Sequence, residues 1–104
     1  MSVPEAPFSA TAAGTNDGAS AAKAAKANST HIVTEISGHV DEDAAVTITD
    51  GGTIAWESLI DVSVEGFSFS FPGLNVVCSV NAIAAGVIAN SNANCQVNIS
   101  GYTR

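Results

Sequence analysis

Alternation of apolar and polar residues between Val46 and Phe71 constrains the fold of this chain more than any other feature. Val46 and Ile48 alternate with two threonines, the period of two that marks a strand with one buried face. Asp50–Gly52 follows, and a glycine pair between two such runs indicates a tight hairpin, because glycine reaches the positive φ that the turn requires. We therefore expect an antiparallel strand pair joined at this turn.

The second half of the stretch supplies most of the aromatic residues. Ile54 and Trp56 alternate with smaller or charged residues and predict the return strand. Phe67, Phe69 and Phe71 alternate with serines, so their strand is expected to bury one aromatic face. Such a stripe could also form a sugar-stacking platform. A core role is favoured, and Trp56 is the residue that could stay exposed because tryptophan is rarely buried completely.

Further strands are expected on both sides of this stretch. The predicted strands are His31–Gly38, Val62–Val64, Val76–Ala85 and Cys95–Tyr102, while Asp41–Asp43 is expected as an exposed acidic turn and Gly86–Asn94 as a loop. Ala19–Asn28 fits a short Ala-rich helix or an edge strand, and we favour the strand because the run is short and lacks large apolar residues. About seven or eight short strands predict an all-β fold, an antiparallel sandwich or barrel.

Residues 1–28 are expected to form an extended N-terminal arm, with the β-sandwich domain over residues 29–104. The arm holds Pro4, Pro7 and little apolar bulk beyond Phe8. Arms of this composition are usually disordered unless something holds them. Two interpretations stay open: Phe8 anchors the arm on its own domain, or a neighbouring chain holds the arm through an interface that includes Phe8, Pro4 and Pro7.

The charge of the chain excludes two classes of partner. Three basic residues stand against ten acidic ones among the 104 residues, a net charge of −7. Nucleic acids and anionic membrane surfaces are both bound through clusters of Lys and Arg, which this chain lacks. Charged residues make up 12% of the chain, about half of the usual share of about 25%. A neutral polar surface of this kind is common in proteins of assemblies and of the cell exterior.

The cysteines leave two alternatives open. No apolar run approaches the ~18 residues of a membrane span, and the first residues lack the basic and apolar regions of a secretory signal. We therefore expect synthesis in the cytoplasm, where thiols stay reduced. Cys78 and Cys95 are expected to face inward on two strands of one hairpin. There they could form a disulfide or remain two buried thiols that pack as small apolar side chains.

The remaining polar clusters favour structural roles. His31, His39 and the acidic run Asp41–Asp43 could hold a metal. The run lacks the ligand spacing of a calcium-binding loop, so a solvated turn is favoured. No glycine-rich loop precedes a helix, and no nucleophile or acid–base pair can be named. We therefore assign no catalytic residue, metal or cofactor, and expect no enzymatic activity.

Three segments, in this order, resemble a group of small tailed-bacteriophage virion proteins. They are THIVTEISGHV, then VTITDGGTIAWESLIDV with FSFSFPGL, and CQVNISGYTR at the end of the chain. The resemblance covers residues 30–104. It implies a jelly-roll-like β-sandwich that decorates or cements the capsid surface of a virion, often as a homotrimer, by bridging subunits of the major capsid protein. The Asp41–Asp43 and Gly86–Asn94 segments would then face the capsid or the solvent.

Two other functions stay open at this point. A small β module displayed on a virion or cell could bind a carbohydrate or receptor through its loops and Trp56. A subunit of an extracellular filament could instead use its arm to complete the sheet of a neighbour by strand addition.

Overall fold

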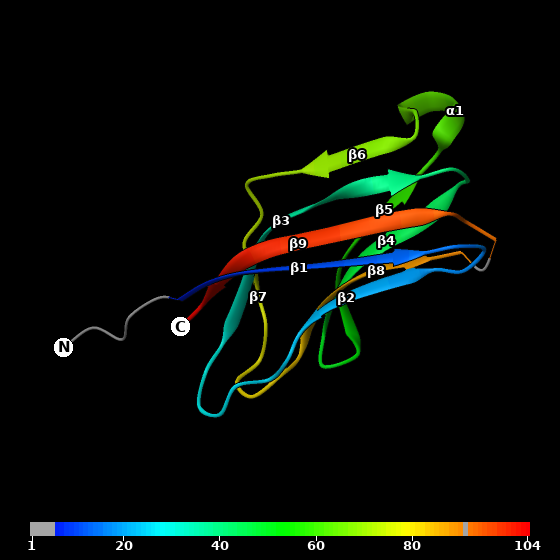
Figure 1. Ribbon diagram of the computed structural model, residues 1–104. Coiled ribbons are helices and arrows are strands. Elements are labelled where there is room, and N and C mark those ends of the chain that lie inside the picture. The colour runs from blue at the N-terminus through cyan, green and yellow to red at the C-terminus, as the bar shows by residue number, and fades with distance from the viewer. Residues whose placement is uncertain (1–5, 91) are drawn as a thin grey trace.

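The computed structural model describes residues 6–90 and 92–104, which form two antiparallel β-sheets packed face to face (Figure 1). The expected all-β sandwich is confirmed. The elements are β1 (Ala6–Gly14), β2 (Ala19–Lys23), β3 (His31–Val40), β4 (Ala44–Asp50), β5 (Thr53–Ile60), α1 (Val62–Glu65), β6 (Ser68–Phe71), β7 (Val76–Val77), β8 (Ala84–Ala89) and β9 (Cys95–Thr103).

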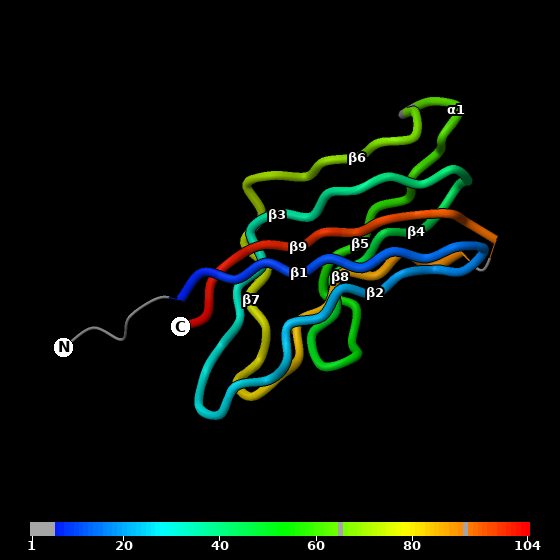
Figure 2. Tube along the Cα trace, in the orientation of Figure 1, coloured from blue at the N-terminus to red at the C-terminus, as the bar shows by residue number. Residues whose placement is uncertain are grey.

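The order of the strands is that of a jelly roll. One sheet has the order β1-β9-β3-β6, with β7 also paired to β3, and the other has the order β2-β8-β4-β5. Four antiparallel pairs, β1·β9, β2·β8, β3·β6 and β4·β5, are nested within one another along the chain. Rolling up one long hairpin produces this nesting, which is why the chain repeatedly crosses between the sheets (Figure 2).

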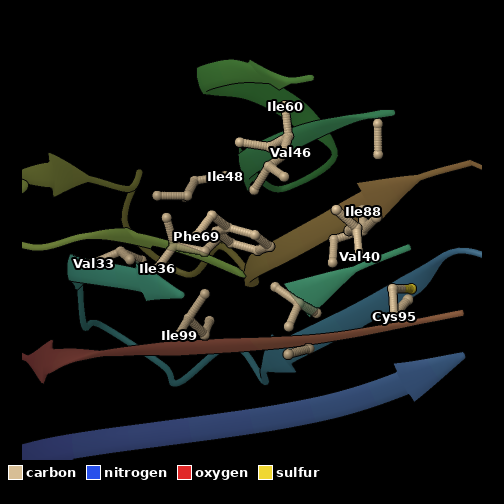
Figure 3. Close-up of a cluster of buried hydrophobic side chains, with 14 of the residues drawn as sticks. Val33, Ile36, Val40, Val46, Ile48, Ile60, Phe69, Ile88, Cys95 and Ile99 are labelled. Atoms are coloured by element: carbon tan, nitrogen blue, oxygen red, sulfur yellow. The ribbon is translucent and has the colours of Figure 1, made fainter. Parts of the chain in front are cut away.

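Branched aliphatic side chains fill the space between the sheets (Figure 3). The largest of those that are completely buried are Ile36, Ile48, Ile60, Ile88 and Ile99. Gly86 on β8 faces Ile99 from the opposite sheet, and a Cβ at this glycine would lie 2.4 Å from Ile99 Cγ2. The glycine therefore lets the two sheets approach closely over the isoleucine.

The sandwich is narrow on one side and wide on the other. On the narrow side, alanines of β1 and β2 contribute to the core. On the wide side, Trp56 of β5 meets Phe71 of β6 at 5.1 Å between ring centroids, with the rings 64° apart. Small side chains let strands of opposite sheets approach, whereas aromatic side chains fill a wider gap.

The segment expected as an arm is extended, but it belongs to the sandwich. β1 pairs with β9 from Ala6↔Thr103 to Gly14↔Cys95. β2 pairs with β8 and forms an edge of its sheet, so the strand interpretation holds for Ala19–Lys23. Because both strands lie within the two sheets, residue 28 does not separate an arm from a domain.

Two predicted elements are wrong. Val62–Glu65 is a short helix rather than a strand, and the carboxylate of Asp61 caps it by accepting a hydrogen bond from the Ser63 N–H at 3.0 Å. Most of the strand predicted at Val76–Ala85 is absent, because β7 covers only Val76–Val77 and the next strand, β8, begins at Ala84. β8 then continues to Ala89, into the Gly86–Asn94 segment that was expected as a loop. The asparagines and the serine of Gly86–Asn94 suggested a loop, yet its first residues continue β8, whose small side chains suit a strand packed against the core.

Two bulges shift the predicted faces. A bulge in β3 between Val33 and Glu35 places both Val33 and Ile36 in the core, although a regular strand would place them on opposite faces. A second irregularity opposite β4 leaves Ile54 58% exposed, while Trp56 packs on the core.

The aromatic face of β6 is only partly buried. Phe69 is buried and Phe71 is half-buried, but Phe67 precedes the strand and is 63% exposed. Gly38 on the neighbouring strand faces Phe69 at φ 155°, and a Cβ there would lie 2.0 Å from the Gln96 carbonyl oxygen. Glycine is therefore required beside the buried phenylalanine.

Candidate functional site

The connections between strands gather at two ends of the sandwich. We define the α1 end as helix α1 with the β1–β2, β3–β4 and β8–β9 connections (Figure 1). We define the hairpin end as the β2–β3 connection, the β4–β5 hairpin and residues 78–83. The hairpin forms as expected, with both turn glycines at positive φ.

Large apolar side chains are exposed at both ends. They are 48% to 79% exposed, and we define them as the α1 patch (Leu59, Val64 and Phe67) and the hairpin patch (Ile54, Val77, Val80 and Ile83). Exposed apolar side chains that lie near one another mark surfaces that bind other molecules more often than isolated ones do. The two patches lie at opposite ends of the strands, so they could contact two different partners.

The two ends also differ in charge. Asp61 and the exposed Asp41–Asp43 turn lie at the α1 end, as does Asp17. The three basic residues of the chain, Lys23, Lys26 and Arg104, lie at the hairpin end. The charge is thus separated along the molecule, whose longest dimension is 49 Å.

A buried histidine organises the hairpin end. His31 is 1% exposed and packs edge-on against Phe8, with ring centroids 5.6 Å apart. Its Nε2 lies 2.8 Å from the Ala24 carbonyl oxygen, which can only accept, so Nε2 carries the proton. Its Nδ1 lies 2.8 Å from Thr103 Oγ1 and accepts from that hydroxyl when the ring is neutral. The ring therefore joins β3, β9 and the β2–β3 connection.

Asp50 fixes the segment after β7. Its carboxylate accepts hydrogen bonds from the Ser79 N–H at 3.0 Å and from the Ser79 hydroxyl at 2.9 Å. These contacts hold the residues around Val80 and Ile83 against the β4–β5 hairpin. They thereby set the position of the hairpin patch.

The two cysteines are free and far apart. Cys78 lies at the hairpin end, where its N–H donates to His31, and Cys95 pairs with Val40 at the α1 end. At about 3.3 Å per strand residue the two positions are on the order of 30 Å apart, so the expected hairpin between them is wrong. Of the two alternatives, the structure has two separate buried thiols and not a disulfide. Burial raises the pKa of both thiols, and the negative charge of Asp50 adds to the effect at Cys78. Both thiols are therefore protonated and unreactive at neutral pH.

The structure does not bring the candidate metal ligands together. His31 points into the core, whereas His39 is exposed on the same strand. Asp41 accepts hydrogen bonds from the backbone and side chain of Asn94 at 2.8 and 2.9 Å. Among the described residues, no group of three or more His, Cys, Asp or Glu side chains is placed to hold a metal. Within residues 6–90 and 92–104, no helix is long and apolar enough to cross a membrane.

The residues expected to anchor the arm have different environments. Phe8 is half-buried against the His31 ring of its own chain, which is the first of the two interpretations of this residue. Pro7 is exposed at the beginning of β1. Pro4 lies outside the described residues.

An open groove at the α1 end was not predicted from the sequence. It has a volume of about 360 Å³ and is lined by Asp43, Ala44, Ala45, Leu59, Ile60, Asp61 and Ala89. Its residues come from three strands and two connections, so no local motif could reveal it. The role of His31 was also missed, although its spacing of two from Val33 is a weak signal of an inward side chain.

No family model, curated protein or solved structure matches this chain.

Proposed function

We propose that this chain is a structural protein without catalytic activity that cements a virion capsid by bridging neighbouring capsid protein subunits. The observation that carries the proposal is the pair of exposed apolar patches at opposite ends of one rigid sandwich. A bridging protein needs two separate attachment surfaces, and the α1 and hairpin patches supply them. The sequence resemblance to phage decoration proteins names the capsid as the partner.

The free edge of β5 supports the same proposal. β5 is an eight-residue edge strand with one charged residue, Glu57, and no Lys or Pro. Soluble monomers usually protect such edges with charged side chains, especially lysines, or with prolines or bulges. An edge that is covered in an assembly needs less protection. The single bulge near the start of β5 leaves most of its length regular.

Many weak contacts of this kind would add up on a particle. Each copy binds through two patches, and a second attachment becomes effectively intramolecular once the first has formed. The summed contacts would resist the outward pressure of packaged DNA. Cementing in this form requires no catalytic chemistry, only attachment at several points.

The test is a sedimentation assay with capsids of the encoding phage from which this chain has been removed. The purified chain should sediment with these capsids in a fixed ratio and should raise the temperature at which they release DNA. Leu59→Ser with Phe67→Ser, and separately Val80→Ser with Ile83→Ser, should each abolish the rise in release temperature. The proposal would be overturned if the wild-type chain did not sediment with these capsids even at a tenfold higher concentration.

One control distinguishes the attachment surfaces from the rest of the exposed surface. Ser9→Ala on the exposed face of β1 should leave capsid binding unchanged, because Ser9 lies in neither patch.

The homotrimer implied by the resemblance stays a prediction, which the mass of the full-length chain in solution tests. Deletion of residues 1–28 is not a suitable probe, because it removes β1 and β2 from the two sheets.

The carbohydrate-binding alternative also stays a prediction. Trp56 is half-buried and packs edge-to-face on Phe71, so its ring helps to close the wide side of the sandwich. No observation on the described residues favours this function over cementing.

A further inference from the structure

The α1 groove combines an apolar floor with an acidic rim. Ala45 pairs with Leu59 on β5 and with Ala89 on β8, so these three side chains lie side by side across three strands. Leu59 is 71% exposed and forms one wall. The volume of about 360 Å³ lies at the lower end of the range for sites that bind small molecules or single side chains.

Two carboxylates stand at fixed positions on the rim. Asp43 Oδ1 accepts a hydrogen bond from the Val62 N–H at 2.9 Å, and Asp61 Oδ1 accepts from the Ser63 hydroxyl at 2.6 Å. The hydrogen bond from the Ser63 hydroxyl, and to a smaller extent that from the Ser63 N–H, lowers the pKa of Asp61. Asp61 therefore stays ionised under mildly acidic conditions. Asp41 and Glu42 on the adjoining turn extend the negative surface.

The chain does not neutralise this surface itself. None of its three basic residues lines the groove, and all three lie at the hairpin end. The exposed Val64 and Phe67 of the α1 patch follow the groove residue Asp61 closely in the sequence. An occupant must therefore offer both an apolar stem and a positive charge.

We propose that the α1 groove binds a segment of a different protein through a Lys or Arg side chain. The aliphatic stem of that residue lies on Leu59 and the alanines, and its charged group meets the carboxylates of Asp43 and Asp61. Lys and Arg combine such a stem and charge in one side chain. The inference rests on the proposed function and names the chemistry of the capsid at this contact: a basic, protruding segment.

A second copy of this chain suits the groove less well than a basic partner. Each copy carries a net charge of −7, so two copies repel each other. Lys23 Nζ lies 6.0 Å from the Phe8 ring centroid, and the Arg104 guanidinium lies 5.6 Å from that of Tyr102. These two cations already pack over aromatic rings of their own chain.

The test compares two double variants that remove the same charge. Asp43→Asn with Asp61→Asn neutralises the rim, and asparagine can still accept the hydrogen bonds that hold α1. Asp17→Asn with Glu35→Gln is the matched control, because neither of these residues lines the groove. Capsid sedimentation at low and high salt is measured for the wild type and for both variants.

The rim variant should weaken capsid binding by about tenfold at low salt, as expected for losing two exposed charge contacts, and the control should change it by less than about twofold. The difference should shrink at high salt, where exposed charges are screened. Equal binding by the rim variant and the control would overturn this inference while leaving the cementing function intact.

A peptide titration keeps the inference testable if the wild type does not bind capsids, an outcome that would reject the proposed function alone. The probe is a short amidated peptide of alternating lysine and leucine, and its control has glutamate in place of lysine. Backbone amide shifts should change around the groove with the lysine peptide only, and the rim variant should reduce the affinity about tenfold. Shifts spread over the whole surface, or equal weakening by the Asp17/Glu35 control, would contradict the inference.

Discussion

Both ends of the sandwich expose large apolar side chains, but the two ends are held together in different ways. At the hairpin end the buried His31 ring and the Asp50 carboxylate join segments that are far apart in the sequence. At the α1 end Asp41, Asp43 and Asp61 also accept hydrogen bonds, those of Asp41 from the distant Asn94, but all of them are exposed. The Asp50 bonds are exposed as well, so the buried His31 ring is what distinguishes the hairpin end. The hairpin end is thus part of the folded core, whereas the α1 end carries its acidic groups on the surface, where a partner can reach them.

The largest effect expected from this difference is that of His31→Ala. The substitution removes the Phe8 contact and leaves the Thr103 hydroxyl, 5% exposed, without its ring partner. We expect the free energy of unfolding to fall by about 3 kcal/mol, since a cavity and an unsatisfied buried group are created together. Urea unfolding at pH 7 measures this loss.

His39→Ala is the matched control on the same strand. His39 is exposed, so its replacement should change the free energy of unfolding by less than about 0.5 kcal/mol. Equal losses for the two histidines would show that the hairpin end is not organised around the buried ring.

A smaller difference is expected between Asp50→Ala and Asp41→Ala. Asp50→Ala removes the bonds from Ser79 to a half-buried carboxylate and should cost about 1 kcal/mol. Asp41→Ala removes two bonds from Asn94 to an exposed carboxylate and should cost less. Thermal unfolding of the two variants under the same conditions compares the ends directly. A larger loss for Asp41→Ala would reverse the comparison.

The thiols report on both ends at once, because Cys78 lies at one and Cys95 at the other. Their raised pKa values in the folded state mean that protonation of the thiols favours folding at neutral pH. This contribution is complete below the unfolded thiol pKa and is lost as the pH rises above about 9.

Stability should therefore decline from about pH 9 upward, and replacing each cysteine by alanine should reduce the decline. A thiol reagent should label neither cysteine of the native chain within minutes at pH 7 and should label both in denaturant. Labelling of fewer than two thiols in denaturant without reductant would indicate a disulfide.

The smallest effect concerns Asp61 at the α1 end. Its lowered pKa in the folded state means that its contribution to the helix cap is present above the unfolded pKa near 3.8 and is lost as the pH falls through the lower folded value. The amide proton of Ser63 should therefore shift with a midpoint below pH 3.8, and Asp61→Asn should remove this transition. A midpoint at or above 3.8 would mean that the cap does not form in solution.

Much of the fold could be predicted because the relevant signals are local. The β4–β5 hairpin follows from the alternation around Val46 and the two turn glycines. β9 follows in the same way: Cys95 faces inward as expected, and Val97 and Ile99 are buried at the same period of two. In both cases one buried face requires a period of two, whatever the rest of the chain does.

β8 could not be predicted, because its residues have meaning only beside their neighbours. Gly86 lies where Ile99 and Ile36 leave no room for a Cβ, and Ala84 is buried in the same core. The bulge between Val33 and Glu35 likewise depends on pairing with β9, since the core must receive both Val33 and Ile36.

The amino-acid sequence by itself determined the all-β character, the principal hairpin, the acidic charge and the exposed acidic turn at Asp41–Asp43, because these depend on composition and short-range geometry. Only the tertiary structure decided the nesting of the strand pairs, the separation of Cys78 from Cys95 and the assembly of the α1 groove. The reason is physical: each of these depends on contacts between residues distant in the chain, whose closure costs entropy that only the completed core offsets.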